Sequence, residues 1–161
     1  MPESPTKKRI LFLDLEETII PEWGDWVVPD GYKQKLLAFI KKFKPNRTEI
    51  FSWAIYGEED LATFEIYRDY LAVEIQTPFD HVNDIASLID DYRATTGIHI
   101  LDERDFFDFV KKERFLFDMA LKGKYPDSHL VLLDDAVESF SLDLPQFNSK
   151  IEVINFKTDL Q

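Results

Sequence analysis

The chain has 161 residues, a formal net charge of −12 and a hydrophobic fraction of 45%. A chain of this length and composition can bury a core of its own as one domain, which excludes an intrinsically disordered protein. It contains no cysteine, so disulfides, thiolate metal sites and a cysteine nucleophile are excluded.

The first predicted strand lies close to the N-terminus. Residues 1–8 are polar and are expected to form a flexible tail, with residues 9–161 as a single domain. Residues 10–13 are a continuous apolar run, which is typical of a strand buried on both faces of a parallel sheet. Residues 19–29 hold a Gly-Asp pair between two tryptophans, and this pattern predicts a small flap hairpin.

The rest of the chain alternates between helical and strand patterns. In chain order we expect a helix at 31–43, a strand at 49–55, a helix at 58–72, a short strand at 73–76, a helix at 81–96, a strand at 98–101, a helix at 103–122 with a candidate break near Lys111, and strands at 129–133 and 151–156. This alternation predicts an α/β fold, a three-layer Rossmann-like parallel sheet with helices on both faces.

Polar side chains follow or end the predicted strands, at the edge where open parallel sheets bind their ligands. The candidates are Asp14, Glu16 and Thr18 after the first strand, Ser52 in the second, Asp134 and Asp135 after the strand at 129–133, and Lys111 or Lys112 in the helix before it. We expect these side chains to converge at one edge of the sheet.

Such a set can support phosphate chemistry. Carboxylates from two strand ends can hold Mg²⁺, which prefers oxygen ligands and keeps several waters. A hydroxyl and a lysine can bind phosphate oxygens, and the metal offsets the repulsion between a carboxylate and an anionic ester. A carboxylate can then attack phosphorus and form an acyl-phosphate intermediate.

Four motifs carry a family resemblance. DLEET at residues 14–18, then Ser52, then Lys111 or Lys112, then DDAVE at residues 134–138 resemble the motifs of the haloacid dehalogenase-like (HAD) phosphatase superfamily, in the family's order. The resemblance implies a HAD-like fold without a large cap and a Mg²⁺-dependent phosphatase. Such an enzyme hydrolyses a phosphomonoester through an aspartyl-phosphate intermediate.

The resemblance also implies a role for the acids after the first strand. Asp14 is the expected nucleophile and a Mg²⁺ ligand, and the backbone carbonyl of Glu16 is a further ligand. The family has an aspartate as general acid and base where this chain has Glu16. Glutamate has the same chemistry with a longer reach, and a misplacement of about 1 Å can cost on the order of a hundredfold in rate.

The remaining motif residues would bind phosphate and complete the metal shell. By resemblance, Ser52 and a lysine contact the phosphoryl oxygens, and Lys111 is preferred over Lys112. Thr18 is expected to brace the loop through its hydroxyl. The resemblance assigns Asp134 to the metal and leaves the shell to be completed by Asp135 or Glu138.

The expected substrate is a phosphorylated small molecule or a nucleic-acid end, with a nucleotide or nucleic-acid end phosphate favoured. Three tryptophans near the site, Trp23, Trp26 and Trp53, can stack on a base or sugar, or pack within the core and flap. The N-terminus lacks a signal-peptide pattern, and no window reaches the roughly 18–20 apolar residues of a membrane helix. We therefore expect a cytoplasmic protein without a membrane partner, and the sequence carries no signal for an oligomeric state.

Two other function classes are considered. Receiver domains also place acids, a hydroxyl and a lysine at strand ends, but their acidic pair follows the first strand, so the order found here disfavours them. A catalytically weak or inactive binding protein on the HAD scaffold is the alternative that Glu16 favours.

Overall fold

The structure is a computed structural model that describes residues 7–100 and 102–160. Within these residues one sheet has the strand order β3-β2-β1-β4-β6-β5. Its strands are β1 (Lys8–Leu13), β2 (Arg47–Ile50), β3 (His81–Val82), β4 (Ser128–Asp134), β5 (Phe140–Leu144) and β6 (Ser149–Asn155). All neighbouring strands run parallel except β5, which runs antiparallel to β6.

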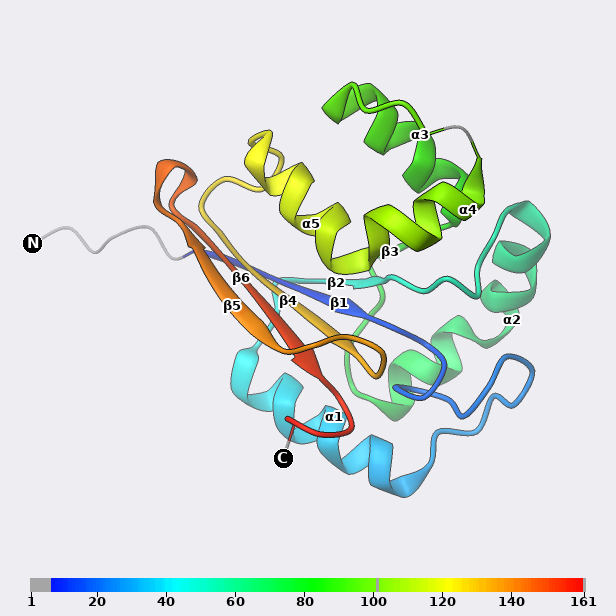
Figure 1. Ribbon diagram of the computed structural model, residues 1–161. Helices are drawn as coiled ribbons and strands as arrows, with labels where there is room; N and C mark the ends of the chain where they lie inside the picture. Colours follow the sequence, from blue (N-terminus) through cyan, green and yellow to red (C-terminus); the bar gives the residue numbers. More distant parts are fainter. Residues whose placement is uncertain (1–6, 101, 161) are drawn as a thin grey trace, which may run out of the picture.

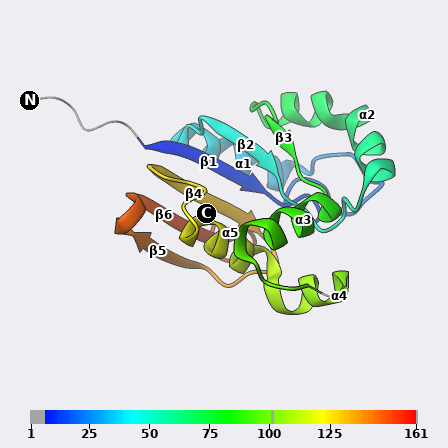
Figure 2. The same cartoon turned by 90° about the horizontal axis from the view of Figure 1, so that it is seen from above.

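Helices cover both faces of this sheet (Figures 1 and 2). They are α1 (Asp30–Phe43), α2 (Glu58–Glu74), α3 (Ile85–Thr96), the short α4 (Glu103–Asp105), the π-helix η1 (Phe106–Val110), α5 (Lys111–Leu121) and the 3-10 helix η2 (Pro145–Phe147). In Figure 1, α1 and α2 lie on one side of the strands and α3 to α5 on the other. The predicted three-layer, Rossmann-like α/β fold is confirmed at this level.

The alternation of side chains along β1 builds two cores. Ile10 and Phe12 pack with buried residues of α3, η1 and α5, while Leu11 and Leu13 pack with buried residues of α1 and α2. Successive residues of a strand point to opposite faces, so a continuous apolar run suits a strand covered on both sides. This explains why residues 10–13 form the centre of the sheet.

Strand register sets the position of the polar residues. Leu13 pairs with Leu133 of β4 and with Ile50 of β2, so these three parallel strands end at the same edge. The backbone N–H of Asp14 then donates to the carbonyl of Leu133 at 3.1 Å. Asp14 and Asp134 therefore leave adjacent strands side by side.

Several predicted boundaries are wrong. Of the strand expected at 73–76, residues 73–74 end α2 and residues 75–76 form the turn after it, because Leu71 and Ile75 are both fully buried at the helical spacing of four residues. The helix expected from residue 81 begins at Ile85, because the Asp84 side chain caps it by accepting from the Ser87 N–H at 3.0 Å.

Two strand predictions also fail. The strand expected at 49–55 spans Arg47–Ile50, since β1 ends at Leu13, whose carbonyl accepts from the Phe51 N–H at 2.8 Å. Of the strand expected at 98–101, residues 98–100 have no strand pairing and residue 101 lies outside the described residues. Arg93 donates instead to the carbonyl of Ile100, which holds this segment against α3.

The expected flap hairpin at 19–29 does not form. Glu16 makes an isolated parallel bridge with Ile20, and no paired strands follow it. Trp26 stacks on Tyr67 of α2 with ring centroids 4.3 Å apart, and Trp23 packs edge-on against Trp26. Aromatic packing onto α2 thus replaces strand pairing in this segment.

Strand β5 was not predicted, and it is short, mostly exposed and paired only with β6. The expected break near Lys111 is confirmed, because η1 ends and α5 begins there. Of the predicted tail, residues 1–6 lie outside the described residues, and Lys8 already belongs to β1. None of the helices described here is both long and apolar enough to cross a membrane.

Candidate functional site

Three carboxylates meet where the two central strands end. Asp14 follows β1, Asp134 is the last residue of β4, and Asp135 comes next in the chain. One carboxylate oxygen from each lies within 4.8 Å of the others. Asp14 and Asp134 are buried and Asp135 is half-buried, so the sequence prediction that these acids converge is confirmed.

Lys112 joins the two buried acids. Its Nζ donates to Asp14 Oδ1 at 2.9 Å and to Asp134 Oδ2 at 2.5 Å, and the lysine is only 7% exposed. The other oxygen of Asp134, Oδ1, accepts from the Ala136 N–H at 2.8 Å. These bonds fix the orientation of both carboxylates.

The electrostatics of this cluster are dominated by burial. Burial raises the pKa of Asp14 to about 7, with Lys112 lowering it and the nearby Asp134 raising it further. Burial lowers the pKa of Lys112, but the two carboxylates outweigh this, so the net pKa lies above its ordinary value. One cation therefore faces two buried acids and Asp135, and this excess of negative charge suits a bound cation.

Glu16 lies at the same edge of the sheet and is hydrogen-bonded to the segment at residues 19–29. It is half-buried, and its Oε2 accepts a hydrogen bond from the Trp23 backbone N–H at 3.0 Å. Thr18 is fully buried, and its hydroxyl has no hydrogen-bond partner within the part of the chain that the structure describes. The bond expected from Thr18 to the loop backbone is therefore absent.

The structure distinguishes the two lysines. Lys112 contacts the aspartates, whereas Lys111 is exposed and lies at the break between η1 and α5. The backbone of Lys111 has φ +60° and ψ 167°, a conformation that is nearly restricted to glycine. The preference for Lys111 as the residue at the aspartates is not supported, because Lys112 donates to both carboxylates.

Ser52 and the metal shell are placed as follows. Ser52 is buried at the end of β2, and its Oγ accepts from the Ala54 N–H at 3.1 Å. The group of clustered carboxylates includes Asp135, while Glu138 is exposed. Of the two alternatives for the shell, the structure thus brings Asp135 to the other acids.

Glu17 contributes a contact that the sequence did not indicate. Its carboxylate accepts from the Tyr32 hydroxyl at 2.9 Å and pairs with Lys157 Nζ at 2.6 Å, and both partners lower the pKa of Glu17. Its backbone has φ +63°, a left-handed conformation that is uncommon for this residue type. The loop after β1 is thereby tied to α1 and to the segment after β6.

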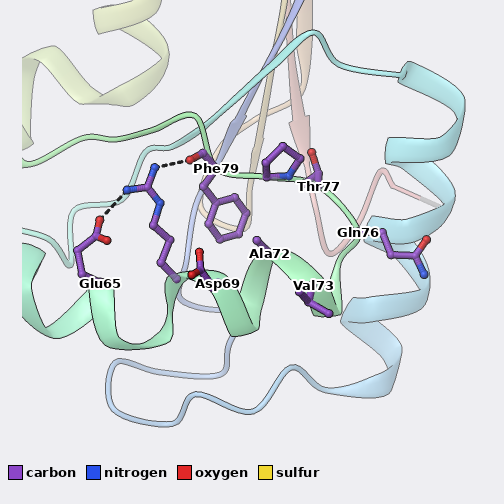
Figure 3. A pocket seen from close by; sticks show the side chains of 9 residues that line it. Glu65, Asp69, Ala72, Val73, Gln76, Thr77 and Phe79 are labelled. Carbon is purple, nitrogen blue, oxygen red and sulfur yellow. Dashed lines mark hydrogen bonds and ion pairs between the residues drawn. The ribbon is translucent and has the colours of Figure 1, made fainter.

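A hollow of about 420 Å³ opens over these groups. Its wall includes the acids Asp14, Glu16, Asp134 and Asp135, together with Ser52 and Lys112. A larger hollow of about 570 Å³ lies along α2 and the loop that follows it (Figure 3). There Arg68 is held by Glu65 and by the Phe79 carbonyl, and none of the clustered acids contributes to its wall.

Comparisons with protein-family models, with curated proteins and with solved structures found no match to this chain. The interpretation of the site therefore depends on its own geometry.

The burial of Asp14 has a consequence for stability. The pKa of Asp14 is about 7 in the folded protein, well above its ordinary value of 3.8, so the folded protein holds the proton more tightly. The stabilisation that this raised pKa gives the folded state is complete below pH 3.8 and is lost as the pH rises towards 7. In metal-free buffer, Asp14→Asn should therefore gain stability relative to wild type over this range, by on the order of 2 kcal/mol at pH 8. Urea unfolding at pH 4, 6 and 8 measures this gain, with the exposed Asp90→Asn as the control. A gain that is absent or independent of pH would contradict the burial argument.

The backbone of Lys111 supports a second stability experiment. Lys111→Gly should raise the free energy of unfolding by about 1 kcal/mol, because glycine accepts this φ and ψ without strain. Lys111→Ala removes the same side chain but keeps the strained conformation, so it should give no gain. Equal stability of the two variants in urea unfolding would show that the backbone at Lys111 is unstrained.

Proposed function

We propose that the protein is a Mg²⁺-dependent phosphatase of the HAD type, which hydrolyses a phosphomonoester through an aspartyl-phosphate intermediate. The observation that carries the proposal is the meeting of Asp14 and Asp134 at Lys112, at the edge where the parallel strands end. Open α/β sheets bind their ligands at this edge. Residues from each of the four resembling motifs line one hollow, which supports the proposal.

The donor set fits Mg²⁺. Asp14, Asp134 and Asp135 offer hard carboxylate oxygens, and Mg²⁺ takes one or a few such ligands together with water and substrate oxygens. Their negative charge exceeds what Lys112 neutralises, which favours a cation over a further acid. A bound Mg²⁺ would lower the repulsion between the acids and an anionic ester.

Asp14 is the proposed nucleophile. One of its carboxylate oxygens forms a bond to phosphorus while the bond from phosphorus to the ester oxygen breaks. The leaving oxygen takes a proton and departs as an alcohol. Water then attacks the acyl phosphate, loses a proton, and releases inorganic phosphate and the free Asp14 carboxylate.

Glu16 is the proposed acid and base for both proton transfers. It lines the same hollow as Asp14. The hydrogen bond from the Trp23 N–H orients its carboxylate. In this role Glu16 gives its proton to the leaving oxygen and takes one from the attacking water.

Lys112 and Ser52 are the proposed phosphate ligands. The ammonium has three N–H donors, and Asp14 and Asp134 take two of them. The third can bind a phosphoryl oxygen, as can the hydroxyl of Ser52 in the wall of the hollow. Lys112 would thus hold the nucleophile and the phosphoryl group together.

A binding protein without turnover is the second candidate. The observation that favours it is that Glu16 already accepts a hydrogen bond from Trp23, which weakens it as a base. In that case the cluster would bind Mg²⁺ and a phosphorylated ligand, and no ester bond would break.

Hydrolysis of p-nitrophenyl phosphate separates the two candidates. The wild type should release p-nitrophenol only when Mg²⁺ is present. Asp14→Asn should lower kcat by on the order of a thousandfold or more, and Glu16→Gln by about a hundredfold to ten-thousandfold. Asp90→Asn, an exposed change on α3, should keep the wild-type rate.

Two results would decide against the enzyme. Full activity in Asp14→Asn would remove the proposed nucleophile. Mg²⁺ binding by the folded wild type, measured by calorimetry, without turnover of any phosphate ester would favour the binding protein.

A further inference from the structure

A second hollow of about 220 Å³ adjoins the one over the acids. The two share Trp53, Lys112, Asp134 and Ala136 in their walls. A ligand whose phosphate lies at Asp14 can therefore extend into the second hollow without leaving the surface. This hollow is the place for the group to which the phosphate is attached.

Two aromatic rings form the walls of this second hollow. The rings of Trp53 and Phe107 have centroids 5.6 Å apart and an interplanar angle of 60°. The ring of Phe106 packs on that of Trp53 with centroids 5.1 Å apart. Lys112 Nζ lies 5.5 Å from the centroid of the Trp53 ring. Trp53 is thus held in place before a ligand arrives, which lowers the entropic cost of binding.

The rim of the hollow is polar and carries both charges. Lys111 supplies hydrogen-bond donors, and Glu113 supplies acceptors. Lys111 keeps its side chain at a backbone conformation that glycine would adopt more easily. Backbone strain of this kind is often found at active sites and ligand-binding sites.

We propose that this second hollow binds the base of a nucleoside monophosphate, and the proposal rests on the phosphatase assignment of the adjoining site. A base stacks on aromatic rings through its π-face. Its edge carries donors and acceptors that Lys111 and Glu113 can match. A sugar alone has no π-face, and a phenyl ring has no polar edge.

A single nucleotide suits the charge of the protein better than a strand. The formal net charge is −12. A nucleic-acid strand binds proteins mainly because several Lys and Arg side chains displace the counterions from its phosphates. The wall of this hollow carries Lys111 and Lys112 together with the acids Glu113 and Asp134, so its two basic residues face as many acidic ones. Further phosphates along a strand would meet acidic surroundings.

The experiment compares esters that share a phosphate and differ in the attached group. Adenosine 5′-monophosphate, ribose 5-phosphate, phenyl phosphate and a 5′-phosphorylated decanucleotide are assayed for kcat/KM, and calorimetry measures their binding. The nucleotide should be the best ligand and substrate. Phe107→Ala should weaken it by about 5- to 100-fold, the range expected for loss of one stacked base, and leave ribose 5-phosphate unchanged.

Phe109→Ala is the matched control. Phe109 lies on the same π-helix as Phe107, but it is 68% exposed and does not line the hollow. Its removal should leave all four ligands unaffected. An equal effect of both variants on the nucleotide would overturn the assignment of this hollow.

The remaining outcomes separate this inference from the phosphatase proposal. If no ester is hydrolysed, the phosphatase proposal fails, and calorimetry alone tests the hollow. Nucleotide binding that Phe107→Ala weakens would then still support the assignment of the second hollow to the base. Absence of nucleotide binding would overturn that assignment. Equal preference for phenyl phosphate or ribose 5-phosphate, or tighter binding of the decanucleotide, would also overturn it.

Discussion

The ammonium of Lys112 between Asp14 and Asp134 is the interaction on which the rest of the site depends. It comes from a helix on one face of the sheet and reaches two acids at the ends of adjacent central strands. Removing such charges from water costs several kcal/mol per ion, and a buried ion pair seldom repays this as stability. One cation with two acids repays it even less. The arrangement is therefore better explained by a ligand that this edge of the sheet binds than by a contribution to folding.

Some unfavourable features lie at the same edge, and residues with positive φ also occur elsewhere, at Lys44, Gln76, Asp127 and Asn148. Glu17 and Lys111, both with positive φ, flank the site on the β1 loop and at the start of α5. The Thr18 hydroxyl is buried without a partner among the described residues. The continuous core strands on either side are regular, and they hold these residues in place.

Sequence reasoning reached the features that depend on local pattern. The apolar run before Asp14 and the one before Asp134 identified the buried strands, and the strand-end rule then brought the acids together. It preferred Lys111, whereas Lys112 contacts the aspartates, because the choice depends on the irregular backbone where η1 meets α5. The strand predicted at 73–76 is wrong because a segment of four residues is too short to distinguish the period of a helix from that of a strand. The contact of Glu17 with Lys157 joins residues far apart in the chain, so no local pattern could indicate it.

A crystal structure from crystals grown with Mn²⁺ tests most directly whether Asp14 and Asp134 bind one metal ion, because anomalous scattering locates the ion independently of activity. Mn²⁺ shares the preference of Mg²⁺ for oxygen ligands. We expect an anomalous peak in contact with carboxylate oxygens of both Asp14 and Asp134, with Lys112 retained beside them. A peak that contacts neither aspartate, or an ion-free cluster in crystals that bind Mn²⁺ elsewhere, would contradict the account.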